Sequence, residues 1–174
     1  MSETVMDATE ADAGAGAGPA DDPLLALHSL PGHLIRRCRQ KSSFMFMECC
    51  ADFDVTPIQY AVLKVVGSNP AIDQSELAAR AALDASTTGQ VVARLARRGL
   101  LFSRRQGQRR LATLTPAGRD LVALIGPAVT EAQVRTLQPL TQREQRQLLR
   151  LLSKMLGLTT PYHSAARPRH RQQW

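Results

Sequence analysis

Residues 84–110 read DASTTGQVVARLARRGLLFSRRQGQRR and contain the signals of one helix and one hairpin. Asp84 is a favourable helix N-cap and Gly99 a favourable C-terminal stop, so residues 85–98 are predicted to form a helix. Two short apolar runs follow, residues 100–103 and 111–114, and they are typical of strands. Residues 104–110 between them contain a glycine and four arginines and are expected to form the hairpin loop.

More helices are predicted on both sides of this stretch. Thr56–Gln59 and Thr141–Glu144 have the spacing of a capping box, and Asp73–Glu76 has a similar one. A long helix is expected over residues 31–51, where Pro31 suits a first turn. The order is helix, helix, short helix, helix, β-hairpin, helix, helix. It predicts a mainly α fold with a small β-hairpin wing: a winged helix-turn-helix plus a helical dimerisation region.

The predicted helix 85–98 has a polar face suited to DNA. The core-facing residues, at steps of four, are expected to be Leu83, Thr87, Val91 and Leu95. On the outer face, small side chains permit close approach to a major groove, and Gln and Arg can read base edges. The alternative is an exposed amphipathic helix that lacks acids. The candidate DNA contacts of the two central helices are Ser75, Ser86, Thr88, Gly89, Gln90, Arg94 and Arg97.

Charge is distributed unevenly along the chain, which has 22 Lys+Arg, 15 Asp+Glu and a net charge of +7. Residues 1–24 hold six acids and no base, whereas residues 85–119 hold eight arginines and no acid. Such a block favours a polyanionic partner, because neutralising phosphates releases counterions; a solubilising surface is the alternative. The hairpin arginines are assigned to phosphates and the adjacent minor groove. They are Arg104, Arg105, Arg109 and Arg110.

The length of 174 residues fits one domain with tails. No apolar run is long enough to span a membrane, and no secretory signal is expected at the N-terminus, so we expect a cytoplasmic protein. No cofactor, metal site or enzyme motif is predicted.

The expected regions are a disordered acidic tail (1–22), an N-terminal dimerisation helix region (23–54), a winged helix-turn-helix DNA-binding region (55–118), C-terminal dimerisation helices (119–158) and a flexible basic tail (159–174).

Four motifs resemble, in the correct order, those of MarR-family transcriptional regulators. They are VTPIQYAVL (55–63), QSELA (74–78), RLARRGL (94–100) and LTPAG (114–118). The resemblance spans residues 24–158 and implies a homodimer whose terminal helices interlock. It also implies a repressor that binds double-stranded DNA at a pseudo-palindromic operator and is released by a small ligand. Gln108 stands where the family often has an Asp, which puts an Asp–Arg brace of the wing in doubt, and the wing looks short.

LPGHLIRR (30–37) is similar to a narrower subgroup, the repressors of nicotinate catabolism that respond to 6-hydroxynicotinic acid. His33, Arg36 and Arg37 lie within about one helical turn of one another. Arg can bind a carboxylate through two hydrogen bonds, and His can bond a ring hydroxyl or nitrogen, so we expect a small aromatic carboxylic acid as effector. A structural role for His33 at the dimer interface is the alternative. An apolar lid is assigned to Phe44, Phe53 and Tyr60, with core packing as the alternative for both phenylalanines.

Two other functions compete with a ligand-released repressor. One is a thiol-based redox-sensing regulator, since some relatives sense oxidants through a first-helix thiol and Cys38 lies among cations, which stabilise a thiolate. Cys38 also falls on an apolar face with Leu34, Met45 and Cys49, where Cys often acts as a small hydrophobe. The other is a non-specific architectural DNA-binding protein, which needs phosphate contacts alone.

Overall fold

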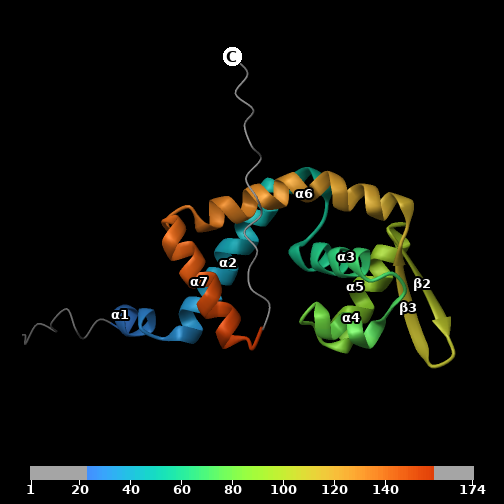
Figure 1. The fold of residues 1–174 in the computed structure, drawn as a ribbon, viewed down its shortest axis with the longest axis horizontal. Coiled ribbons are helices and arrows are strands. Elements are labelled where there is room, and N and C mark those ends of the chain that lie inside the picture. Colours follow the sequence, from blue (N-terminus) through green and yellow to red (C-terminus); the bar gives the residue numbers. More distant parts are fainter. Residues whose placement is uncertain (1–22, 159–174) are drawn as a thin grey trace, which may run out of the picture. The chain divides into compact units, whose positions relative to one another are not determined.

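A computed structural model of the protein describes residues 23–158, so both predicted tails lie outside the described residues. The helices are α1 (Pro23–His28), α2 (Pro31–Cys49), α3 (Pro57–Ser68), α4 (Gln74–Arg80), α5 (Ala85–Arg97), α6 (Pro116–Leu137) and α7 (Gln142–Met155), with a 3-10 turn at Ala51–Phe53. The strands are β1 (Ile72–Asp73), β2 (Leu101–Gln106) and β3 (Arg109–Leu114) (Figure 1). Two compact units meet between Gln40 and Lys41, inside α2. Among the described residues, no helix is both long and apolar enough to cross a membrane.

The helix starts follow the capping residues. Thr56 and Thr141 each form the predicted capping box, in which the threonine hydroxyl accepts from the backbone three residues on and that residue's side chain accepts in return. Asp84 accepts from Thr87 N at 2.7 Å, and Gly99 ends α5 with φ +69°, as predicted. The box expected at Asp73–Glu76 was wrong: Asp73 caps α4 alone, because Glu76 pairs with Arg80 at 2.7 Å instead.

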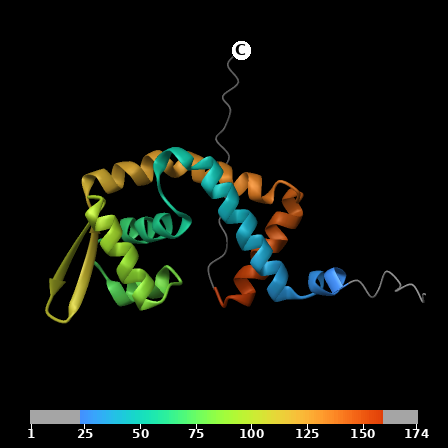
Figure 2. The ribbon, with the colours of Figure 1, turned by 180° about the vertical axis from the view of Figure 1, so that it is seen from behind.

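The first core belongs to the module formed by α3, α4, α5 and the sheet. Its fully buried side chains include Leu63, Leu77 and Leu95, one from each helix. The sheet order is β1-β3-β2, with both pairs antiparallel. β1 was missed, because two residues are too few to give a periodic signal. In Figure 1 and Figure 2 the hairpin projects beyond the helices of this module.

The hairpin, which we call the wing, is longer than the sequence predicted. β2 and β3 reach to Gln106 and back from Arg109, and Gly107 in the turn has φ +59°. The four arginines are therefore on the strands and not in a loop, which corrects the prediction. The hydrogen bonds between paired strands come from the backbone and do not require apolar side chains. The two strands therefore continue beyond the apolar residues from which they were predicted.

A second core joins the end of α2 to α6. Phe46, Cys50, Val55 and Ile125 are buried there, with Phe53 and Tyr60 packed against them. Arg135 on α6 donates to Glu48 on α2 at 2.9 Å, across the same contact. On the face expected to be apolar, Cys49 and Met45 are half-buried, whereas Leu34 and Cys38 are exposed. None of the residues of α7 is buried in the single chain.

Candidate nucleic-acid interface and effector site

α5 presents its polar face to solvent, but its buried stripe differs from the one predicted. Thr88 and Leu95 are fully buried and Val92 is 2% exposed. Leu95 was predicted correctly, but Thr87 in the first turn is only half-buried, and Leu83 and Val91 only flank the core. The Thr88 hydroxyl donates to Asp84 O at 2.8 Å within the helix. Thr88 is therefore a core residue, and assigning it to DNA contact was wrong.

The other predicted DNA contacts on α4 and α5 divide into two groups. The exposed ones are Ser75, Ser86, Gln90, Arg94 and Arg97. Gly89 is half-buried, and a Cβ there would lie 3.1 Å from Gln74 Nε2, so this glycine lets α4 and α5 pack closely. The Ser75 hydroxyl donates to Asp73 at 2.6 Å and is held in one orientation.

The wing carries exposed positive charge on both of its faces. Arg105 lies directly across from Arg110, whereas Arg104 faces Leu111 and Arg109 faces Gln106. Like charges opposite each other destabilise an antiparallel pair unless an anion lies between or beside them. Of the ion pairs found in residues 23–158, none includes a wing arginine. The wing is thus a surface with unpaired positive charge.

Asp73 stands at the base of the wing and was recognised in the sequence only as a cap. Hydrogen bonds from Ser75 hold the pKa of this carboxyl below its usual value, and the nearby charge of Arg109 acts in the same direction. A cleft of about 530 Å³ separates α4 from β3. Its lining is Asp73, Gln74, Ser75, Ala85, Gln108, Arg109 and Arg110. Asp73, at the end of β1, is thus an acid close enough to Arg109 to feel its charge, although no ion pair joins the two among the described residues.

The predicted effector residues of the first unit lie together on α2 with one more side chain. Arg36 Nη2 is 3.5 Å from His33 Nδ1, and Arg37 Nη1 is 3.1 Å from Nε2 of His28 on α1. The two imidazole rings are 5.8 Å apart. Sequence analysis missed His28 because it lies outside the LPGHLIRR motif. The sequence offered one sign of this residue, since His28 lies five positions before His33.

The three predicted aromatic residues belong to the second unit. Phe44 is 58% exposed, so core packing is wrong for this residue. Phe53 and Tyr60 are half-buried in the second core, and Tyr60 lies 5.9 Å from Phe46 ring to ring. Burial raises the pKa of the Tyr60 hydroxyl. Core packing, which the sequence analysis gave as the alternative to an apolar lid, therefore accounts for Phe53.

Known proteins resemble this chain in both sequence and fold. Residues 53–111 match the MarR family. The HTH-type transcriptional repressor NicR of Pseudomonas putida is 28% identical over 143 residues, which cover 80% of this chain and 90% of NicR. BpsR of Bordetella bronchiseptica, whose DNA binding is regulated by 6-hydroxynicotinic acid, is 30% identical with a TM-score of 0.71, covering 74% of this chain and 95% of that one. The PcaV transcriptional regulator of Streptomyces coelicolor, solved with its natural ligand, is 32% identical with a TM-score of 0.68, covering 77% and 96%.

This chain belongs to the MarR family. The resemblance and the fold class predicted from the sequence are confirmed. Members of the MarR family are DNA-binding transcriptional regulators and not enzymes, and some of them respond to small ligands.

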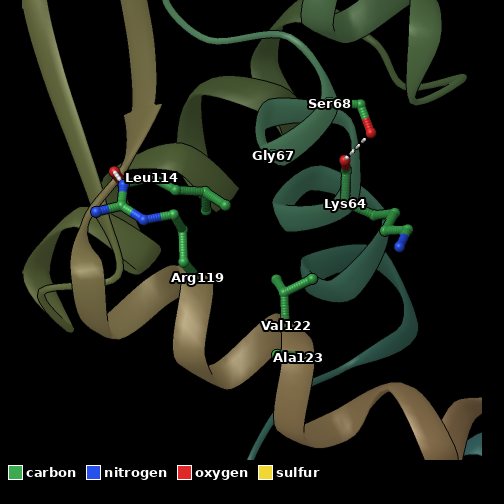
Figure 3. A pocket seen from close by; sticks show the side chains of 7 residues that line it. All are labelled: Lys64, Gly67, Ser68, Leu114, Arg119, Val122 and Ala123. Carbon is green, nitrogen blue, oxygen red and sulfur yellow. Dashed lines mark hydrogen bonds between the residues drawn. The ribbon is translucent and has the colours of Figure 1, made fainter.

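A second cleft of this MarR module lies between α3 and α6, next to Leu114 at the end of β3. It has a volume of about 290 Å³, and its polar side chains are Lys64, Ser68 and Arg119. Figure 3 shows that the Arg119 guanidinium turns to the Leu114 carbonyl, to which it donates at 3.1 Å, while Lys64 extends away. The two cations do not converge, and none of the predicted effector residues lines this cleft.

The three cysteines of this MarR protein have different surroundings. Cys38 is exposed on α2, Cys49 accepts from Arg135 Nη1 at 3.4 Å, and Cys50 is buried. Burial raises the pKa of the Cys50 thiol, which disfavours the reactive thiolate. Within residues 23–158, no group of three His, Cys, Asp or Glu side chains is placed to hold a metal ion.

Proposed function

We propose that the protein is a homodimeric repressor of aromatic or nicotinate catabolism genes in the cytoplasm. It binds a pseudo-palindromic operator through residues 55–118 and dimerises through residues 23–54 and 119–158. A small aromatic carboxylic acid, 6-hydroxynicotinic acid above all, releases it. The observation that carries the DNA part is the exposed, acid-free arginine surface of α5 and the wing. The proposal for the ligand rests on the His33, Arg36 and Arg37 cluster and on the similarity to NicR and BpsR.

Exposed apolar side chains support the dimer. Large hydrophobic residues that are scattered singly are normal on a surface, but here many of them occur on the terminal helices and around them. They are Leu27, Leu30, Leu34, Ile35, Phe44, Met47, Val134, Leu151, Met155, Leu156 and Leu158. A second copy of the chain would remove this surface from water, which is favourable at roughly 25 cal/mol per Å².

The DNA interface follows from the exposed residues of the module. Gln90 and Arg94, one turn apart on α5, are placed to read base edges in a major groove, with Ser86 and Arg97 beside them. Gly89 acts indirectly, because it lets α4 pack closely against α5. Ser75 at the start of α4 would contact a phosphate by turning its hydroxyl away from Asp73. The wing arginines, Arg104, Arg105, Arg109 and Arg110, contact phosphates and the minor groove. Two modules related by a two-fold axis read half-sites about one helical turn, ~34–36 Å, apart.

Release needs an effector that distinguishes two arrangements of the dimer. A ligand with equal affinity for the DNA-bound and free arrangements would shift nothing. We propose that the carboxylate binds Arg36 and Arg37 and that His33 bonds the ring substituent. The apolar lid assigned to Phe44, Phe53 and Tyr60 remains a prediction from the sequence.

The deciding experiment is DNA binding by fluorescence anisotropy on an operator selected from random duplexes by the protein itself. Titrating 6-hydroxynicotinic acid, nicotinic acid and benzoic acid into the complex should dissociate it, most strongly with the first. If none of these acids changes the affinity for DNA, the proposed effector is wrong. The DNA part of the proposal is judged separately, by the binding curve without acid.

Two substitutions distinguish this repressor from its alternatives. Gln90→Ala and Arg94→Ala should each weaken the selected operator more than a scrambled duplex; equal losses on both would favour the architectural protein. Cys38→Ser should leave release by the acid unchanged. If the wild type is released by a hydroperoxide and Cys38→Ser is not, the thiol-based alternative replaces the proposed effector.

A further inference from the structure

Two histidines and two arginines meet where α1 is followed by α2, and no acid of residues 23–158 forms an ion pair with them. Arg37 Nη1 approaches His28 Nε2 at 3.1 Å, and Arg36 Nη2 approaches His33 Nδ1 at 3.5 Å. The sequence contains no Asp or Glu from residue 23 to residue 47. The four side chains come from one unit of the protein, so their arrangement does not depend on the second unit.

These contacts define which ring nitrogens can accept a hydrogen bond. A guanidinium nitrogen can only donate, so in this arrangement Nε2 of His28 and Nδ1 of His33 are the acceptors. A ring nitrogen that accepts from an arginine carries no proton of its own, so the contact with Arg36 disfavours protonation of His33 at that nitrogen. The electrostatics agree for His33: desolvation lowers its pKa most, and the charges of Arg36, Arg37 and His28 lower it further. All of these charged and titratable neighbours oppose protonation, and no carboxylate among the described residues acts against them.

A carboxylate would reverse this balance. It is a better acceptor for a guanidinium than a neutral imidazole is, because charge-assisted hydrogen bonds are the stronger ones. The guanidinium groups of Arg36 and Arg37 would turn to the anion and free the two ring nitrogens. A freed imidazole next to an anion then takes a proton from solvent and gains an N–H that can donate to the bound acid.

We infer that His28 belongs to the effector site and that the site binds an aromatic carboxylate together with protons taken up by His28 and His33. This inference rests on the proposed effector function and adds to it a residue outside the LPGHLIRR motif and a dependence on pH. The anion and the protons bind in the same step, so each favours the other by the same factor. The acid would thus release the repressor more readily in a more acidic cell.

The sign of the pH dependence follows from the two protonation states. The pKa of His33 is lowered in the free protein and is raised when the anion binds. Affinity for the anion is highest at a pH below the pKa of His33 in the free protein, which is lowered from 6.5. The affinity falls as the pH rises from that value to the higher pKa of His33 in the complex. Each proton taken up changes the affinity by roughly tenfold per pH unit between these two values.

The test is isothermal titration calorimetry of the full chain with 6-hydroxynicotinic acid, and with benzoic acid as a minimal aromatic carboxylate. Titrations between about pH 6 and pH 8, in buffers with different ionisation enthalpies, count the protons taken up. His28→Gln and His33→Gln keep an acceptor for the arginine but cannot be protonated. His163→Gln replaces a histidine 130 residues after His33 in the sequence and is the control for the loss of one histidine.

The wild type and His163→Gln should take up between one and two protons per site and bind more weakly as the pH rises. Each of His28→Gln and His33→Gln should take up about one proton fewer and show a flatter pH profile. Binding that is independent of pH and unchanged in His28→Gln would overturn the inference and leave the proposed effector intact. An absence of binding by both acids at every pH would overturn the proposed effector, and this inference with it.

Discussion

The wing arginine Arg110 gives a prediction in which DNA binding and stability change in different ways. Arg110 is exposed on β3 and lies directly across from Arg105 on β2. Replacing it with alanine removes a proposed phosphate contact and also removes one member of a like-charge pair. We therefore expect Arg110→Ala to bind DNA more weakly without a lower melting temperature.

The size of the effect follows from counterion release. Each phosphate contact contributes about 0.9 to the slope of log affinity against log salt concentration. A homodimer carries the substitution twice, so the slope should become shallower by up to about 1.8. When salt is raised from about 50 to about 200 mM, the wild type should then lose roughly tenfold more affinity than Arg110→Ala does.

The assay is fluorescence anisotropy with the selected operator and a scrambled duplex at several salt concentrations. Both duplexes should be affected alike, because a phosphate contact carries no sequence information. Arg146→Ala on α7 is the control, since it removes one exposed charge at a position without a proposed DNA contact. An unchanged salt slope in Arg110→Ala would refute the assignment of the wing. A loss confined to the selected operator would instead place Arg110 against a base.

Three further predictions concern the module itself. Thr88→Val keeps the shape of a buried side chain and should cost about 1 kcal/mol of stability while leaving DNA affinity unchanged; weaker operator binding would restore the DNA role. Gly118→Ala should cost about 1–3 kcal/mol in urea unfolding, because its Cβ would overlap the Leu100 carbonyl oxygen; an unchanged midpoint would contradict this packing. Hydrogen bonds donated by Thr87 lower the pKa of the Asp84 carboxyl, so the stabilisation that Asp84 gives is present above pH 3.8 and is lost as the pH falls below that value. Circular dichroism should find Asp84→Asn less sensitive to acid than the wild type, and equal sensitivity would count against the cap.

Most signals that act between residues close in the sequence were read correctly, the box at Asp73–Glu76 being the exception. Thr56, Asp84 and Thr141 accept from backbone donors two or three residues away, so their helix starts follow from local chemistry alone. Gly99 ends α5 because it adopts a positive φ easily. The arginine surface of α5 and the wing could also be predicted, because charge density is a property of composition.

Errors arose where a position depends on a distant partner. Over a single helix, buried residues spaced four apart are hard to distinguish from buried residues spaced alternately three and four apart. Only packing against α3 and α4 decides that Thr88 is buried and Thr87 is not. Strand lengths in the wing depend on pairing across the turn, so Arg104 and Arg105 were assigned to a loop. Asp73 and Arg109 lie 36 residues apart, and their proximity comes from the pairing of β1 with β3.

The sequence by itself determined the class of fold, the order of α2 to α7 and the basic character of α5 and the wing, because these depend on local capping, periodicity and composition. It indicated the MarR family through the resemblance of four motifs, and it did not predict α1. The tertiary structure decided which face of α5 is buried, how far the wing extends, which acid approaches the wing arginines and that His28 joins the cluster of His33, Arg36 and Arg37. Those features depend on contacts between segments distant in the chain, whose energies no local pattern records.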